Sequence, residues 1–198
     1  MMKLSKTQVE IMKIFVAKIN EKFSIKQVSQ LIKKPYPLIH RSIKPLIENN
    51  TIYKDEHGLL FLNYKEHHQT ASYVESLRAE TFLQKNKTIG LFVKDVLDNV
   101  KINSFIFLVF GSSARGKIKP NDIDIMLIVP DETSKIEKIV DRIASNFSKN
   151  IHSNTIGMES AREMLSKRDK LNVMNETLNS HIILYGAENY YRLLKYAR

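Results

Sequence analysis

The chain has 198 residues, 43% hydrophobic and 26% charged, a balance typical of globular proteins. It contains no cysteine, which excludes disulfide bonds and thiolate zinc sites. It has no apolar run near the roughly 20 residues of a membrane-spanning helix and no apolar signal core, so we expect a cytoplasmic protein. The net charge is +10, and residues 1–70 supply +6 of it. Such an excess favours nucleic acid or another polyanion as partner, although a lysine-rich proteome would produce the same excess.

The first third of the chain predicts three short helices followed by a hairpin. Ser5 and Ser24 each stand three residues before a glutamine, a capping-box spacing, and an apolar helical stripe follows each of them. A third helix is expected after residue 35, but Pro45 inside it would cost about 3 kcal/mol unless the helix kinks or begins late. Residues 51–54 and 59–62 then flank a turn that ends in Gly58, which predicts a hairpin with this glycine in the left-handed conformation.

This order of elements resembles a winged helix-turn-helix domain, over roughly residues 4–64, and we assign residues 1–66 to it. The resemblance implies that the third helix enters the major groove of DNA. The candidate contacts are Tyr36, His40, Arg41 and Lys44 on the helix and Lys54 on the wing. A winged helix that serves for homodimerisation or docking is the alternative.

The rest of the chain predicts an α/β (α+β) domain with a small mixed sheet, preceded by a helical linker over residues 67–87. Two continuous apolar runs, 104–110 and 122–129, indicate strands that are buried on both faces. Further strands are expected at 151–156 and 181–186. Helices are expected at about 70–85, 89–100, 130–147, 159–167, 169–179 and 187–196. Residues 88–198 would form the sheet domain.

Between the two buried strands, the stretch GSSARGK from Gly111 to Lys117 has the glycine and lysine spacing of a P-loop. The next position of a P-loop is Ser or Thr, but here it is Ile118. A P-loop lysine also begins a long helix that holds the phosphates, whereas here Pro120 and then a strand follow. These two departures disfavour the P-loop.

Asp122 and Asp124 favour a different phosphate site. Residues i and i+2 of a strand point to one face, so the two carboxylates would lie side by side, with Ile123 and Ile125 buried opposite. Close carboxylates repel each other unless a cation lies between them, and such oxygen-rich sites suit Mg²⁺ or Mn²⁺. The Gly-Ser turn would offer backbone N–H groups and a hydroxyl to a phosphate. The alternative, a turn at Asn121 and a solvated Asp124, fits Asp-x-Asp alone but not its surroundings.

The combination Gly111-Ser112, Ala114-Arg115-Gly116 and Asp122-x-Asp124 resembles the signature of the DNA polymerase beta superfamily of nucleotidyltransferases. It is most similar to the small prokaryotic members called minimal nucleotidyltransferases, over roughly residues 88–198. The resemblance implies a Mg²⁺-dependent transfer of a nucleoside monophosphate, most often AMP from ATP, to a hydroxyl of a protein or nucleic acid. Many minimal nucleotidyltransferases adenylylate a HEPN-family toxin, so such a toxin is one candidate partner.

The resemblance also implies roles for individual residues. Asp122 and Asp124 would be the catalytic metal ligands of a two-metal reaction. The nucleotide would be bound by Gly111, Ser112, Ser113, Arg115 and Lys117.

One part of the family pattern is missing. Active members usually carry a third carboxylate on the following strand, but residues 150–156 contain no acid. His152 occupies the best-aligned position, and we interpret it as an ordinary polar residue because Mg²⁺ favours oxygen ligands. Glu159, just beyond the strand, is the other candidate. The alternative function is therefore a catalytically weak or inactive nucleotide-binding regulator that binds DNA through the winged helix.

Overall fold

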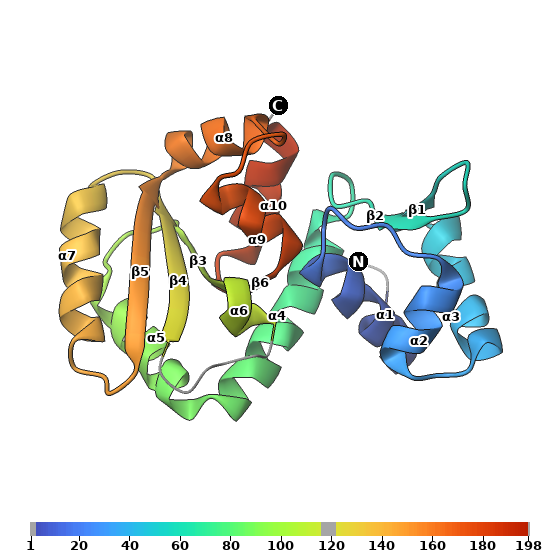
Figure 1. Ribbon diagram of the computed structural model, residues 1–198, viewed down its shortest axis with the longest axis horizontal. Coiled ribbons are helices and arrows are strands. Elements are labelled where there is room, and N and C mark those ends of the chain that lie inside the picture. Colours follow the sequence, from blue (N-terminus) through green and yellow to red (C-terminus); the bar gives the residue numbers. More distant parts are fainter. Residues whose placement is uncertain (1–2, 116–121, 198) are drawn as a thin grey trace.

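The computed structural model describes residues 3–115 and 122–197. It begins with helices α1 (Lys6–Ala17), α2 (Ile25–Ile32) and α3 (Tyr36–Glu48), followed by the hairpin strands β1 (Ile52–Lys54) and β2 (Leu60–Leu62) (Figure 1). Ser5 and Ser24 form the two capping boxes that the sequence predicts. Gly58 has a φ of 77°, which confirms the left-handed position in the hairpin turn.

Helix α3 begins at Tyr36 and continues through Pro45. Pro37 lies in the first turn, where a missing N–H has no helical partner to lose. Pro45 lies in the last turn. The helix buries Ile39, Ile43 and Leu46 along one face, and this burial outweighs the loss of one hydrogen bond near its end.

The larger sheet has four strands in the order β5-β4-β3-β6. Their bounds are β3 (Ile106–Phe110), β4 (Asp122–Val129), β5 (Asn150–Gly157) and β6 (His181–Tyr185). Strand β3 pairs antiparallel with both β4 and β6, whereas β4 and β5 are parallel. The expectation of a small mixed sheet is confirmed. The two predicted apolar runs, β3 and β4, are the central strands, and both are buried except at Asp122 and Asp124, where β4 begins.

Helices cover both faces of this sheet (Figure 1). Helices α5 (Lys87–Asn99) and α7 (Thr133–Ala144) share a core with one face, which includes Val109, Ile123 and Ile125. The other face packs against α8 (Met158–Ser166), α9 (Val173–Asn179) and α10 (Ala187–Tyr196). In the part of the chain that the structure describes, no helix is long and apolar enough to cross a membrane.

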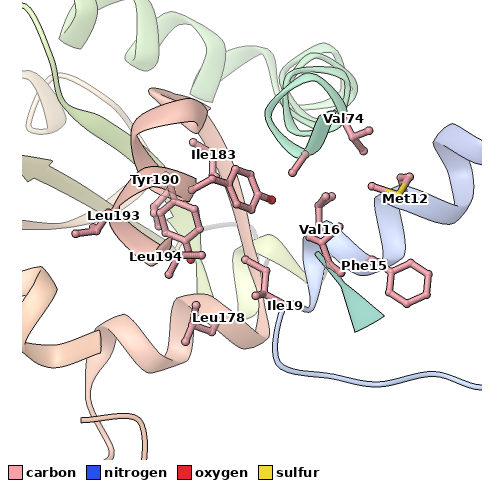
Figure 2. Close-up of a cluster of buried hydrophobic side chains, with 14 of the residues drawn as sticks. Met12, Phe15, Val16, Ile19, Val74, Leu178, Ile183, Tyr190, Leu193 and Leu194 are labelled. Atoms are coloured by element: carbon pink, nitrogen blue, oxygen red, sulfur yellow. The ribbon is translucent and has the colours of Figure 1, made fainter. Parts of the chain in front are cut away.

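Helix α4 (His68–Lys85) lies between the N-terminal helices and the sheet, and it packs against α1, α10 and β6. One core runs from Met12 and Val16 of α1, past Val74 of α4, to Ile183 and Tyr190 (Figure 2). The Ile19 N–H also donates to the Leu178 carbonyl at 3.0 Å. Helix α1 is therefore attached to the sheet by a shared apolar core, which sets the position of its exposed side chains relative to the sheet.

Candidate functional site

The two aspartates lie at the beginning of β4, on one face of the sheet. Ile123 and Ile125 between and beside them are buried in the core under α5 and α7, on the opposite face. This confirms the predicted alternation. The side chain of Asp122 is exposed and that of Asp124 is half-buried, so both carboxylates are open to solvent.

The Gly-Ser turn lies against the second aspartate. Residues Gly111–Ala114 form the single helical turn α6 directly after β3. Gly111 has a φ of 63°, a left-handed conformation that glycine adopts without steric cost. A Cβ atom added to Gly111 would lie 3.4 Å from Asp124 Oδ2. The turn and the carboxylate are therefore neighbours in space, although 13 positions separate them in the sequence.

The side chains of this turn differ in their accessibility. Ser112 and Arg115 are exposed. Ser113 is fully buried, and its hydroxyl donates to the Asp122 carbonyl at 3.2 Å. The Ser113 side chain thus joins the turn to β4, which leaves only its backbone N–H for a ligand. Lys117, also expected at the nucleotide, lies outside the described residues.

Strand β5 places neutral polar groups beside the aspartates. In the parallel register Asn150 is the partner of Asp122, and His152 is the partner of Asp124. The Asn150 side-chain amide donates to Asp122 Oδ1 at 3.1 Å and lies 3.0 Å from His152 Nε2. His152 does lie next to Asp124, as the sequence suggested. Beside Asp122, the neighbouring side chain is the amide of Asn150 and not an acid.

Glu159 does not reach this site, so it is wrong as a candidate for the third carboxylate. Strand β5 extends to Gly157, which is the register partner of Val129 at the far end of β4. Seven residue steps along a strand span about 23 Å. Glu159 follows that far end in α8, where it pairs with Arg162.

The donor set at the aspartates fits a hard divalent cation. Asp124 has no hydrogen bond or ion pair to another described side chain, and Asp122 has only the amide of Asn150. Within residues 3–115 and 122–197, no group of three or more His, Cys, Asp or Glu side chains is arranged to hold a metal. Mg²⁺ is commonly held by one or two carboxylates, with water and substrate phosphates supplying the other oxygens. Two carboxylates with no cationic partner among the described side chains therefore suit Mg²⁺ or Mn²⁺.

A buried ionic network, which sequence reasoning missed, supports β6 beside the Gly-Ser turn. Glu75 is fully buried on α4 and binds Arg78 and His181. Arg78 also donates to the His181 carbonyl at 2.7 Å, and His181 is the register partner of Phe110, immediately before Gly111. The only signal in the sequence was a Glu and an Arg three positions apart on a helix expected to be a linker.

The geometry of this network defines its charges. Nδ1 of His181 lies 2.6 Å from the Thr177 carbonyl oxygen, and Nε2 lies 3.1 Å from Glu75 Oε1. Both neighbours are acceptors, so both ring nitrogens must donate. Burial by itself would raise the pKa of Glu75, but the charges of Arg78 and His181 outweigh burial and lower it. The network therefore holds two positive charges and one negative charge.

The predicted nucleic-acid contacts are all on the surface. Tyr36, His40, Arg41 and Lys44 of α3 and Lys54 of β1 are exposed. The rings of Tyr36 and His40 lie 5.9 Å apart, and with Pro37 and Arg41 they line a cavity of about 320 Å³. Lys44 is 3.8 Å from Glu48, so part of its charge is balanced.

Comparisons with protein-family models, with curated proteins and with solved structures found no match to this chain.

Proposed function

We propose that the chain is a nucleotidyltransferase that transfers a nucleoside monophosphate, AMP from ATP in the expected case, to a protein or nucleic-acid hydroxyl. The observation that carries this proposal is the proximity of Gly111 to Asp124, 3.4 Å from a Cβ at position 111 to Oδ2. It joins a helical turn, whose first backbone N–H groups have no partner within the turn itself, to a pair of carboxylates with no cationic partner among the described side chains. A triphosphate–metal complex needs both kinds of group within a few ångströms.

Each residue of the site would have a separate task. Asp122 and Asp124 would hold Mg²⁺ or Mn²⁺, which neutralises phosphate charge and activates the attacking hydroxyl when bound. The backbone N–H groups of the turn and the Ser112 hydroxyl would donate to phosphate oxygens. Arg115 is exposed and would pair with a phosphate. Ser113 would keep the turn against β4 through its bond to the Asp122 carbonyl.

The N-terminal elements would form a winged helix-turn-helix that binds DNA. Three helices and a hairpin occur in the required order, and the side chains of Tyr36, His40 and Arg41 on α3 are exposed. Cationic and aromatic side chains on an exposed helix suit contacts with phosphates and base edges.

A regulator that binds the nucleotide without turning it over is the second candidate. The neighbours of the aspartates on β5 favour it, because Asn150 and His152 stand where a third carboxylate would be expected. Without that acid, a bound metal–nucleotide would lack a group that accepts the proton of the attacking hydroxyl.

The test is a label-transfer assay with the purified chain, Mg²⁺ or Mn²⁺, α-labelled nucleoside triphosphates and a cell lysate as acceptor. The transferase proposal expects labelled acceptor and pyrophosphate. Both should be lost in Asp124→Asn and kept in Asp98→Asn, a matched change at an exposed residue of α5. Transfer that survives Asp124→Asn would refute the metal site. Nucleotide binding without pyrophosphate release would favour the regulator.

A further inference from the structure

A second site is indicated by a cavity of about 470 Å³ where α1, α4, α6 and β6 meet. Its walls come from four elements that are far apart in the sequence. The lining residues are Lys13 of α1, four residues of α4 (Arg78, Thr81, Phe82 and Lys85), Asn86 directly after α4, Ala114 of α6 and Ile182 of β6. The volume lies within the range of about 300–1,000 Å³ typical of small-molecule sites.

The described walls of this cavity are positively charged. Lys13, Arg78 and Lys85 contribute three cations, and none of the described lining residues is acidic. Arg78 is held by Glu75 and by the His181 carbonyl. No hydrogen bond or ion pair connects Lys13 or Lys85 to another described residue, so both ammonium groups are available to a ligand. The ligand should therefore be an anion.

The remaining lining residues indicate more than a simple inorganic anion. Phe82 and Ile182 are largely buried, each 8% exposed, and with Ala114 they form an apolar wall. Thr81 and Asn86 add a hydroxyl and an amide, which can donate to and accept from a heterocycle. An apolar wall with a few hydrogen-bonding groups suits a flat ring, and unpaired lysines suit phosphates.

The cavity is not the aspartate site. Ile182 is the register partner of Val109, and both belong to the core under α5 and α7, together with Ile123 and Ile125. The side chains of Asp122 and Asp124 point from the opposite face of the sheet. The two sites have α6 in common, since Gly111 begins it beside Asp124 and Ala114 ends it at the cavity.

We propose that this cavity binds a nucleoside polyphosphate, with its phosphates on Lys13 and Lys85 and its base against Phe82 and Ile182. Lys13 belongs to the N-terminal helices and Ala114 to the turn next to the aspartates. The bound nucleotide therefore connects the proposed DNA-binding elements with the Gly-Ser turn. The proposal does not require that the chain transfer nucleotides, because it rests on separate residues.

Binding is measured by calorimetry with ATP as the probe and excess EDTA, so that a metal-dependent complex at the aspartates does not form. The key variant is Lys13→Ala/Lys85→Ala. Its control is Lys94→Ala/Lys138→Ala, which removes the same charge from exposed residues of α5 and α7. A third protein, Asp122→Asn/Asp124→Asn, tests the separation of the sites. Adenosine and inorganic tripolyphosphate are titrated in parallel to separate the contributions of base and phosphate.

We expect ATP to bind the natural chain, the control pair and the aspartate variant with similar affinity. Loss of both lysines should weaken ATP binding about tenfold or more, because each substitution removes a charge-assisted contact with a phosphate. Tripolyphosphate and adenosine should each bind more weakly than ATP. ATP should also raise the melting temperature of the natural chain but not that of the lysine variant.

Three results would overturn the proposal. The first is equal ATP affinity in the natural chain and in Lys13→Ala/Lys85→Ala. The second is a marked rise of ATP affinity in the aspartate variant alone, because metal-free carboxylates repel phosphates beside them, and such a rise would place the nucleotide on the other face of the sheet. The third is no binding of ATP to the natural chain at millimolar concentration. Tripolyphosphate binding equal to that of ATP would remove the base from the proposal and leave a polyphosphate site.

Discussion

Gly111 and Asp124 lie so close together that a Cβ atom at position 111 would be 3.4 Å from Asp124 Oδ2. Gly111 also adopts a left-handed conformation, with a φ of 63°. The left-handed conformation favours glycine at this position, and a methyl group there would be in van der Waals contact with the Asp124 carboxylate.

Gly111→Ala is expected to destabilise the fold by about 1 kcal/mol, because alanine is strained at positive φ. The loss of label transfer should be larger than the loss of folded protein explains, because the new methyl group would lie against the Asp124 carboxylate. The control is Gly90→Ala in α5, where the nearest atom to a new Cβ is 4.0 Å away and the backbone is helical. That change should stabilise the chain by about 0.5–1 kcal/mol. Denaturant unfolding of both variants measures these effects, and equal stabilities would contradict the strain at Gly111.

Glu75→Gln is expected to destabilise the chain by about 3 kcal/mol or more, because it removes the buried negative charge that balances Arg78 and the buried His181. Denaturant unfolding at neutral pH measures the loss. The control is Glu80→Gln, an exposed position on the same helix. A Glu75 variant as stable as this control would show that the network contributes little.

The same network predicts how stability depends on pH. The pKa of Glu75 is lowered below 4.5 in the folded chain, because Arg78 and His181 outweigh its burial. A lowered folded-state pKa contributes stability that is present above the unfolded pKa and is lost as pH falls through the folded pKa. The natural chain should therefore lose more stability than Glu75→Gln as the pH falls below about 4.5. Parallel loss in both proteins would contradict this assignment.

His152→Asp would place a third carboxylate next to Asp124, where His152 is the register partner. If the missing acid limits catalysis, this variant should bind Mn²⁺ more tightly and raise label transfer about tenfold or more. Asn154→Asp is the control, because Asn154 pairs with Met126, two residues further along the strand. Calorimetry with Mn²⁺ reports on the metal separately from activity. No change in either measurement would show that this position is not where the acid is needed.

Arg41→Ala should weaken DNA binding at every salt concentration and reduce the slope of log affinity against log salt by about 1 if Arg41 contacts a phosphate. Lys26→Ala, an exposed cation of α2 outside the predicted contacts, is the control. A change confined to one DNA sequence would instead assign Arg41 to a base. If the affinity of the natural chain does not fall with salt, the phosphate contacts of the N-terminal elements are refuted.

Local patterns were sufficient to predict most of the elements. The capping serines, the left-handed Gly58 and the alternation of aspartate and isoleucine in β4 all depend on neighbours within four residues. The missing acid of β5 was also visible, as was the alignment of His152 with Asp124. Glu159 does lie just beyond β5, but it was a wrong candidate because β5 runs parallel to β4 and ends far from the aspartates, and local sequence does not report the direction of pairing.

The sequence by itself determined where a chain reversal and two carboxylates occur, because glycine conformation and strand alternation are local properties. Only the tertiary structure decided that Gly111 lies next to Asp124, that Glu75 is buried beside Arg78 and His181, and that Lys13 and Lys85 line one cavity. Glu75 and Arg78 are three positions apart on one helix, but the other partners are 13 to 106 positions apart in the chain. Packing of α1, α4 and β6 around shared apolar cores brings them together, and no pattern within one segment specifies such a distance.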